Sequence, residues 1–548
     1  MKNFIHTFES TVRNCWEKPA LGDYRKTDDT YKDIAENIAT LHLLLDKVGI
    51  RKGEHIAINA RSSRNWLETF MGLQTGGYVS VLMFNGFTPA DTQNLVNHSD
   101  SRILFTEAAI YGRMSLEEMP QVIGVIDTNT FECLDGRNGF KEAFEDRKAL
   151  FEARYPQGMK PEDVCYPGME MKDVCTIMYT SGSTGNPKGV MINVENFSVN
   201  VEDLKDDFPY RSGDNYLSIL PFAHIFGLVC DGIIPLCLGM HEVVLGLPPI
   251  PANVHEAMCA LRPRIFFAVP LILNKFIDFS IGKEISTEEG RAKLEDYGNN
   301  QEFCKALHDK MIADLGGNIE EFVTGGAAIP EDLETMLTKK LGLPFATGYG
   351  MTETCPLISI APLGEYKMKS CGKISRLCLD LKTTSDDPEN IPGEVLVKGP
   401  GVFTGYYKNP EATKAVFTED GWFRTGDMGL VDKDRNVFLV GRCKNMLLGT
   451  NGQNIYPEEI EVILNVLPYV AESIVISRGK KLVALIVPNA NKVAEDGIDA
   501  ETLSALMKKN IEKLNTMIPT YSAVSDFELM QEPFAKTPKG SIRRFMYA

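Results

Sequence analysis

Long apolar runs are absent from this 548-residue sequence, which argues against two classes of protein. The most apolar segment, Ile225 to Met240, is shorter than a bilayer-spanning helix and contains Asp231 and Pro235. The first 22 residues, MKNFIHTFESTVRNCWEKPALG, lack the uninterrupted apolar stretch of a secretory signal peptide. We therefore expect neither a transmembrane segment nor an export signal.

Excess basic charge and paired cysteines are also lacking. The sequence has 57 Lys and Arg against 74 Asp and Glu, a net charge of −17, which argues against nucleic-acid binding through a broad basic surface. Small anionic ligands need only a local basic pocket and stay possible. The twelve cysteines are scattered, without a CxxC pair or a His/Cys cluster, so neither a zinc site nor a disulfide framework is indicated. Reduced thiols and a cytoplasmic location are expected.

The length of the chain predicts two or more domains. In the first 170 residues, helical patterns such as Tyr31 to Val48 alternate with short apolar strands such as Gly53 to Ala60. This alternation predicts α/β layers with mainly parallel sheets. Beyond Gly393 strands and turns dominate, and the last hundred residues combine a hairpin around Arg478 to Lys481 with amphipathic helices. We expect a large N-terminal domain of layered α/β sheets with a β-rich subdomain (1–441), and a small mobile α+β domain (442–548).

A loop rich in glycine and hydroxyl residues, YTSGSTGNPKGV, follows the apolar run VCTIM and spans Tyr179 to Val190. It is not a Walker loop, because Lys188 follows proline instead of glycine. It nevertheless offers hydroxyl donors, glycines that let backbone amides approach an anion, and one cation. On composition alone, a Gly/Ser surface turn is the simpler interpretation. The residues that would bind phosphate are Thr180, Ser181, Gly182, Ser183, Thr184, Gly185 and Lys188.

The string TSGSTGNPKG resembles the signature loop of the adenylate-forming superfamily, which includes acyl-CoA synthetases, luciferases and adenylation domains. Five further segments resemble the motifs of that family in the same order. They are GGAAIP (Gly325 to Pro330), TGYGMTET (Thr347 to Thr354), WFRTGDMG (Trp422 to Gly429), GRCKNMLLGTNGQNIYPEEIE (Gly441 to Glu461) and KTPKGSIRR (Lys536 to Arg544). The resemblance spans roughly Asp23 to Arg544.

The resemblance implies a nucleotide site made from these motifs. Tyr349 would stack on adenine, and the backbone around Gly326 and Ala327 would read the edge of the base. Asp427 and Arg442 would bind the ribose hydroxyls. Considered alone, Tyr349 is typical of a core residue and Asp427 of a turn residue, so their roles depend on the ordered set of motifs.

The resemblance also implies residues for the chemistry. Lys188 and the glycine-rich loop would grip the β- and γ-phosphates, Thr352 would hydrogen-bond the α-phosphate, and Glu353 would help to hold Mg²⁺. His224, in LPFAHIFG, would lie beside the acyl carboxylate, although a single histidine on an apolar face is more often a core residue. Lys444 fits the position of the hinge between the domains.

The C-terminal motif departs from the family pattern. Aligned on Gly540 and the following arginines, the position of the family's catalytic lysine holds Ser541, and a lysine stands two places earlier, at Lys539. Because a lysine side chain is long and flexible, we expect Lys539 to support adenylation through a shifted loop. Adenylation carried by Lys188 and the metal, or by Lys536 or Arg543, is the alternative.

The expected activity is ATP-dependent activation of a carboxylic acid to acyl-AMP, followed by transfer to CoA, with ATP and CoA as substrates and Mg²⁺ as cofactor. A polar, helix-like stretch after the histidine motif resembles long-chain fatty acyl-CoA synthetases, so a medium- or long-chain fatty acid is expected. Two alternatives stay open: a ligase that loads a carrier-protein thiol, and a weakened relative that binds acyl groups or nucleotide. The oligomeric state is open.

Overall fold

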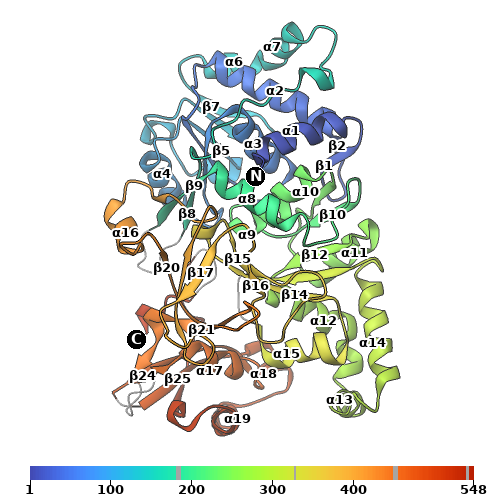
Figure 1. The fold of residues 1–548 in the computed structure, drawn as a ribbon, viewed down its shortest axis with the longest axis vertical. Coiled ribbons are helices and arrows are strands. Elements are labelled where there is room, and N and C mark those ends of the chain that lie inside the picture. The colour runs from blue at the N-terminus through green and yellow to red at the C-terminus, as the bar shows by residue number, and fades with distance from the viewer. Residues whose placement is uncertain (181–186, 326–328, 449–453, 480, 538–541, 548) are drawn as a thin grey trace.

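An eight-stranded sheet forms the centre of the N-terminal part (Figure 1). The structure, a computed structural model, describes residues 1–548 except 181–186, 326–328, 449–453, 480, 538–541 and 548. The four central pairings, from β8 through β4, β3 and β5 to β6, are parallel, as predicted for this part of the chain. In spatial order the strands are β19 (Gly405–Tyr406), β9 (Lys188–Asn193), β8 (Val174–Thr180), β4 (Val79–Leu82), β3 (His55–Asn59), β5 (Ile103–Thr106), β6 (Gly124–Asp127) and β7 (Cys133–Gly136).

Helices connect the parallel strands and cover the sheet. α3 begins after Ser63, whose side chain accepts a hydrogen bond from the Trp66 N–H. It is capped at its C-terminal end by Gly77, whose φ of 82° favours glycine. The helix predicted over Tyr31 to Val48 is confirmed as α2. The helices of this region are α1 (Phe4–Asn14), α2 (Tyr31–Lys47), α3 (Arg64–Gly76), α4 (Pro89–His98), α5 (Ala108–Tyr111), α6 (Phe140–Glu145), α7 (Arg147–Arg154) and α8 (Val194–Leu204).

A four-stranded sheet joins the start of the chain to residues more than 190 positions later. β1 pairs in parallel with β11, with Leu21 opposite Glu242. Its strands, in spatial order, are β10 (Asn215–Ser218), β11 (His241–Val244), β1 (Pro19–Asp23) and β2 (Asp28–Thr30).

A five-stranded sheet carries the central motifs of the sequence. Its strands are β12 (Ile265–Ala268), β13 (Glu321–Thr324), β14 (Phe345–Gly350), β15 (Leu357–Ile360) and β16 (Lys373–Ile374). Its helices are α11 (Pro251–Leu261), α12 (Pro270–Ile285), α13 (Glu288–Glu295), α14 (Gln301–Asp314) and α15 (Glu331–Thr335). The buried face of α12, which includes Leu273, Phe276 and Ile277, packs into a second hydrophobic core with residues of α11 and α14.

The β-rich region is an antiparallel sheet of four strands, with α16 (Pro410–Ala415) beside β19. In spatial order these are β17 (Asp380–Thr383), β18 (Gly393–Lys398), β20 (Phe423–Val431) and β21 (Val437–Arg442).

The C-terminal part has its own hydrophobic core, which contains Leu464, Ala484, Ile486 and Met507. In Figure 1 it lies at the end of the molecule opposite α2 and α7. The predicted hairpin is confirmed, with Arg478 opposite Lys481. Its elements are β22 (Leu447–Leu448), β23 (Asn454–Ile455), α17 (Pro457–Leu464), β24 (Val470–Arg478), β25 (Lys481–Pro488), α18 (Ala490–Glu495), α19 (Ala500–Met517) and β26 (Val524–Leu529).

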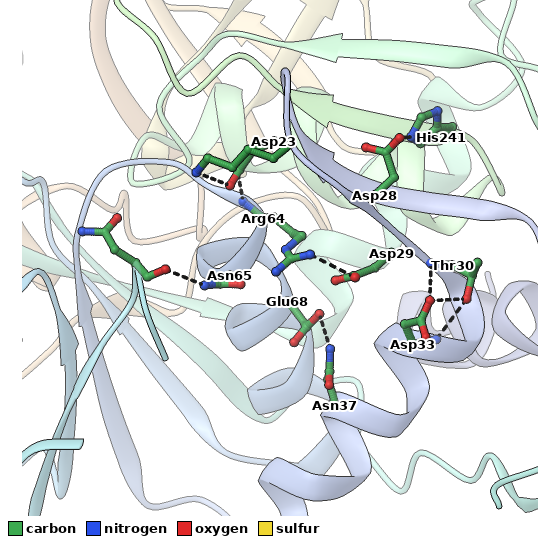
Figure 2. Close-up of polar contacts among 12 residues, drawn as sticks. Asp23, Asp28, Asp29, Thr30, Asp33, Asn37, Arg64, Asn65, Glu68 and His241 are labelled. Carbon is green, nitrogen blue, oxygen red and sulfur yellow. Dashed lines mark hydrogen bonds and ion pairs between the residues drawn. The ribbon is translucent and has the colours of Figure 1, made fainter. Parts of the chain in front are cut away.

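Polar contacts tie α2 and α3 to the β1–β2 hairpin (Figure 2). Arg64 Nη1 lies 2.9 Å from Asp29 Oδ1, and Asn37 Nδ2 donates to Glu68 Oε2 at 3.1 Å. Burial raises the pKa of Glu68 to about 8, so this carboxyl group is largely protonated at neutral pH. The contact between these elements therefore consists of the Arg64–Asp29 ion pair beside the neutral carboxyl group of Glu68.

The apolar segment at Ile225 to Met240 forms short buried helices, α9 (Ile225–Leu228) and α10 (Ile234–Cys237), joined by a π-helical turn. Asp231 Oδ2 accepts hydrogen bonds from the Ile219 and Leu220 N–H groups at 3.1 and 2.9 Å. Throughout the described part of the chain, no helix combines the length and apolar character needed to cross a bilayer.

Candidate active site

The glycine-rich loop connects two antiparallel strands. β8 leads into it and β9 leads out, with Thr180 opposite Lys188 in the register. Both residues are half-buried. Ser181, Gly182, Ser183, Thr184 and Gly185 lie outside the described residues, so their phosphate-binding roles stay predictions.

Tyr406 links the end of this loop to the predicted Mg²⁺ ligand. Lys188 Nζ lies 4.8 Å from the centroid of the Tyr406 ring, a cation–π contact. The hydroxyl of the same ring donates to Glu353 Oε1 at 2.9 Å. Burial, followed by the charge of Glu353, raises the pKa of Tyr406, so the phenol keeps its proton and acts as donor. The sequence predicted only strand and turn around Tyr406, and its contacts emerge from the structure.

The segment TGYGMTET forms the end of β14 and a 3-10 turn, Thr352–Thr354. Gly350 allows this turn, because a Cβ there would lie 1.9 Å from the Pro356 carbonyl oxygen. Thr352 is buried and Glu353 is half-buried. Gly326 and Ala327, predicted to read adenine, lie outside the described residues.

The predicted ribose residues lie on paired strands. Asp427 on β20 stands opposite Arg442 on β21, and Arg442 Nε lies 2.7 Å from Asp427 Oδ1. The Tyr349 hydroxyl donates to Asp427 Oδ2 at 2.6 Å. Burial raises the pKa of Asp427, while Arg442 and the Tyr349 hydroxyl oppose that rise. Three predicted nucleotide residues from separate motifs therefore form one contact chain.

His224 occupies the turn before α9 and is half-buried. The Phe226 N–H donates to its Nδ1 at 3.3 Å. Gly227 lets the turn close, because a Cβ there would lie 2.4 Å from the Pro221 carbonyl oxygen. Asp231 fixes the backbone just before this turn, which sequence patterns alone did not indicate.

The predicted hinge residue, Lys444, is exposed in a 3-10 turn, Cys443–Asn445, directly after β21. Asn445 donates to Glu458 on α17, so the turn contacts the C-terminal part. Near the chain end, Lys536 pairs with Glu472 and forms a bridge with Ile542. Lys539 and Ser541 lie outside the described residues, so the catalytic role of Lys539 stays a prediction.

Glu353 offers a carboxylate oxygen, the kind of ligand that Mg²⁺ prefers. Its Oε1 accepts the Tyr406 hydroxyl, and its Oε2 makes no hydrogen bond or ion pair with any residue that the structure describes. Searched over those same residues, the chain contains no group of three or more His, Cys, Asp or Glu side chains able to hold a metal. One half-exposed carboxylate fits Mg²⁺ that is bound mainly through substrate phosphates.

Comparison with known proteins gives two family matches. The AMP-binding enzyme family matches residues 8–407, and the AMP-binding enzyme C-terminal domain matches residues 444–547. Among relatives, the probable acyl-activating enzyme 16, chloroplastic, of Arabidopsis thaliana is 25% identical over 94% of this chain and 82% of its own length. The long-chain-fatty-acid–CoA ligase FadD15 of Mycobacterium tuberculosis is 24% identical over 95% and 86%, and human long-chain-fatty-acid–CoA ligase 1 is 26% identical over 90% and 73%.

Solved structures share the fold. ATP-bound MatB from Rhodopseudomonas palustris superposes with a TM-score of 0.76 at 20% identity, covering 99% of this chain and 97% of that one. The o-succinylbenzoate CoA synthetase MenE of Bacillus subtilis, in complex with its acyl-adenylate intermediate, gives 0.74 at 22% identity, covering 100% and 97%. These likenesses confirm the predicted α/β fold with a large N-terminal and a small C-terminal domain. Because the first family match alone covers most of the sequence, the chain belongs to the AMP-binding enzyme family, the adenylate-forming superfamily that its motifs resemble.

Proposed function

We propose that the protein is an ATP-dependent acid–CoA ligase, which forms an acyl-adenylate, releases pyrophosphate and transfers the acyl group to CoA. One observation carries the proposal. The segment from Tyr349 to Glu353 contacts Asp427 through its first residue and Tyr406 through its last. The end of β14 and the turn after it therefore link Asp427, proposed to bind ribose, to Tyr406, which contacts the proposed phosphate-binding Lys188.

In the first half-reaction, the acid's carboxylate attacks the α-phosphorus of ATP and pyrophosphate leaves. Asp427 accepts hydrogen bonds from the ribose hydroxyls, Thr352 donates to the α-phosphate, and Lys188 neutralises the leaving phosphates. Glu353 would hold Mg²⁺, which supplies further positive charge at the phosphates when bound. His224, at the turn before α9, orients the acid's carboxylate.

The second half-reaction needs a thiol to reach the activated carbonyl. We propose a domain boundary at Gly441 and Arg442, with Lys444 in the turn that absorbs the rotation of residues 442–548. Lys539 serves the first half-reaction and withdraws for the second.

For the acid we propose a medium- or long-chain fatty acid, in the cytoplasm. Relatives named long-chain-fatty-acid–CoA ligases, at 24 to 26% identity, support this choice. The stretch that forms α13 and α14 also supports it, because its sequence resembles that of long-chain fatty acyl-CoA synthetases. Each methylene of a buried tail would contribute about 0.8 kcal/mol to binding.

The test is pyrophosphate release and thioester formation with acids from acetate to palmitate and with benzoate, each with and without CoA. We expect CoA thioesters from C8 to C16 acids. Lys188→Ala should abolish them, whereas Lys408→Ala, which removes a lysine paired with Asp100, should not. Pyrophosphate release without a CoA thioester would indicate a carrier-protein acceptor, and no release with any acid would indicate a weakened relative.

A further inference from the structure

We propose that Tyr406 is a positioning residue that couples the Mg²⁺-binding carboxylate of Glu353 to the phosphate-binding ammonium group of Lys188. The inference rests on the proposed function, because it concerns the phosphates of the same ATP. The buried ring of Tyr406 contacts both residues. Its hydroxyl donates a hydrogen bond to Glu353 Oε1 at 2.9 Å, and its centroid lies 4.8 Å from Lys188 Nζ. Tyr406 is 6% exposed.

The backbone holds Tyr406 in place on both sides. β19 pairs with β9, with Tyr406 opposite Val190, and the Tyr407 N–H donates to the Gly189 carbonyl at 2.8 Å. The Tyr406 N–H donates to Thr413 Oγ1 at 2.9 Å. The backbone of Tyr406 is therefore paired with the residues that directly follow Lys188, which fixes the position of the ring relative to that lysine.

Glu353 is fixed to the same segment through its main chain. The Phe403 N–H donates to the Glu353 carbonyl oxygen at 2.8 Å, and the Phe403 ring packs against Tyr406 with centroids 5.0 Å apart. Main chain and side chain of Glu353 are thus both held by residues 403–406. The short segment that ends in β19 therefore contacts both the TGYGMTET motif and β9, which follows the glycine-rich loop.

This arrangement prepares Glu353 for a metal. A hydrogen bond to one carboxylate oxygen restricts rotation of the side chain and leaves Oε2 for a cation. Partners that orient a metal-binding carboxylate typically change metal affinity by about 10- to 100-fold when removed. The cation–π contact restricts Lys188 in the same way, with a smaller effect.

The experiment measures ATP binding to the full chain by calorimetry, in Mg²⁺ and in EDTA, without acid or CoA. Tyr406→Phe keeps the ring under Lys188 and removes the hydroxyl, so the gain in affinity from Mg²⁺ should fall about 10-fold or more, with metal-free affinity unchanged. Tyr406→Leu also removes the ring, so metal-free affinity should fall by a further ~2- to 5-fold. Tyr407→Phe is the matched control, because it removes a neighbouring phenol that donates to Asp100 at 2.9 Å; both affinities should be unchanged.

A double-mutant cycle with Glu353→Gln separates positioning from general destabilisation. Once the carboxylate is gone, adding Tyr406→Phe should cost no further Mg²⁺-dependent affinity. Equal Mg²⁺ gains in wild type and Tyr406→Phe, or additive losses in the cycle, would overturn the inference and leave the proposed function intact. A wild-type chain that binds no ATP in either buffer would overturn both. Thermal unfolding of each variant checks its fold, and Tyr406→Leu tests the inference by itself if Tyr406→Phe does not fold.

Discussion

Tyr349 donates its phenolic proton to Asp427 across 2.6 Å, and this bond joins two motifs that lie 78 positions apart. Arg442 occupies the other oxygen of the same carboxylate at 2.7 Å. A residue proposed to stack on adenine and two residues proposed to bind ribose are therefore oriented by direct contacts with one another.

Asp427→Ala should weaken ATP binding, because each hydrogen bond to a charged group contributes roughly 1.5–3 kcal/mol. The substitution also deprives the buried Tyr349 hydroxyl of its acceptor, so some loss of thermal stability is expected. Tyr349→Phe is the control: it keeps the ring and the Asp427–Arg442 pair, and should lose less affinity. Unchanged ATP affinity of Asp427→Ala in calorimetry would exclude the ribose role.

Lys539→Ala should slow pyrophosphate release sharply and spare thioester formation from pre-made acyl-adenylate. The reason is that attack on the α-phosphate needs nearby positive charge, whereas thiol attack follows domain rotation. Lys536→Ala serves as control, since that lysine pairs with Glu472, and adenylation should persist. Ser541→Lys should add little. A large gain from Ser541→Lys would instead identify a weakened family member.

Lys444→Pro should block one half-reaction more than the other, because proline fixes φ near −65° in the turn where rotation is proposed. Lys444→Ala keeps the backbone free and should affect both half-reactions only mildly. Single-turnover measurement of pyrophosphate release and of thioester formation compares the two variants. Equal loss of both steps in Lys444→Pro would contradict the hinge assignment.

Glu68 should make stability fall as pH rises. Its folded pKa, about 8, is above the ordinary value of 4.5, so the stabilisation is fully present below pH 4.5 and is lost as pH rises toward 8. Each pKa unit corresponds to about 1.4 kcal/mol. Glu68→Gln should therefore gain stability relative to wild type between pH 5 and pH 8.5, measured by urea unfolding. Glu411→Gln replaces an exposed glutamate, and its stability should change with pH as that of the wild type does. If the stability of Glu68→Gln also changes with pH as that of the wild type does, the raised pKa of Glu68 is contradicted.

Local elements of this fold are predictable from sequence because their signals are local. The apolar period over Tyr31 to Val48 predicted α2, and the predicted strand at Gly53 to Ala60 agrees with β3. The pairing of β1 with β11 is different, since it joins residues more than 200 positions apart and leaves no periodic pattern in either segment.

The candidate site divides in the same way. Motif resemblance indicated Tyr349, Glu353 and Asp427 individually, but not the hydrogen bonds between motifs. Tyr406 carried no sequence signal of its role, because its significance lies in being adjacent to Glu353 and Lys188 in space.

β19 is an edge strand of the eight-stranded sheet, and it is synthesised long after its neighbour β9. β9 ends at Asn193, yet its neighbour β19 begins at Gly405, 212 positions later (405 − 193). At about 5–20 residues per second, a ribosome needs roughly 10–40 s to make that interval. During this time the outer edge of β9 has no strand to pair with, and exposed strand edges promote association between chains. We therefore expect this edge of β9 to be open to association with other chains after the glycine-rich loop has emerged and before Tyr406 is made.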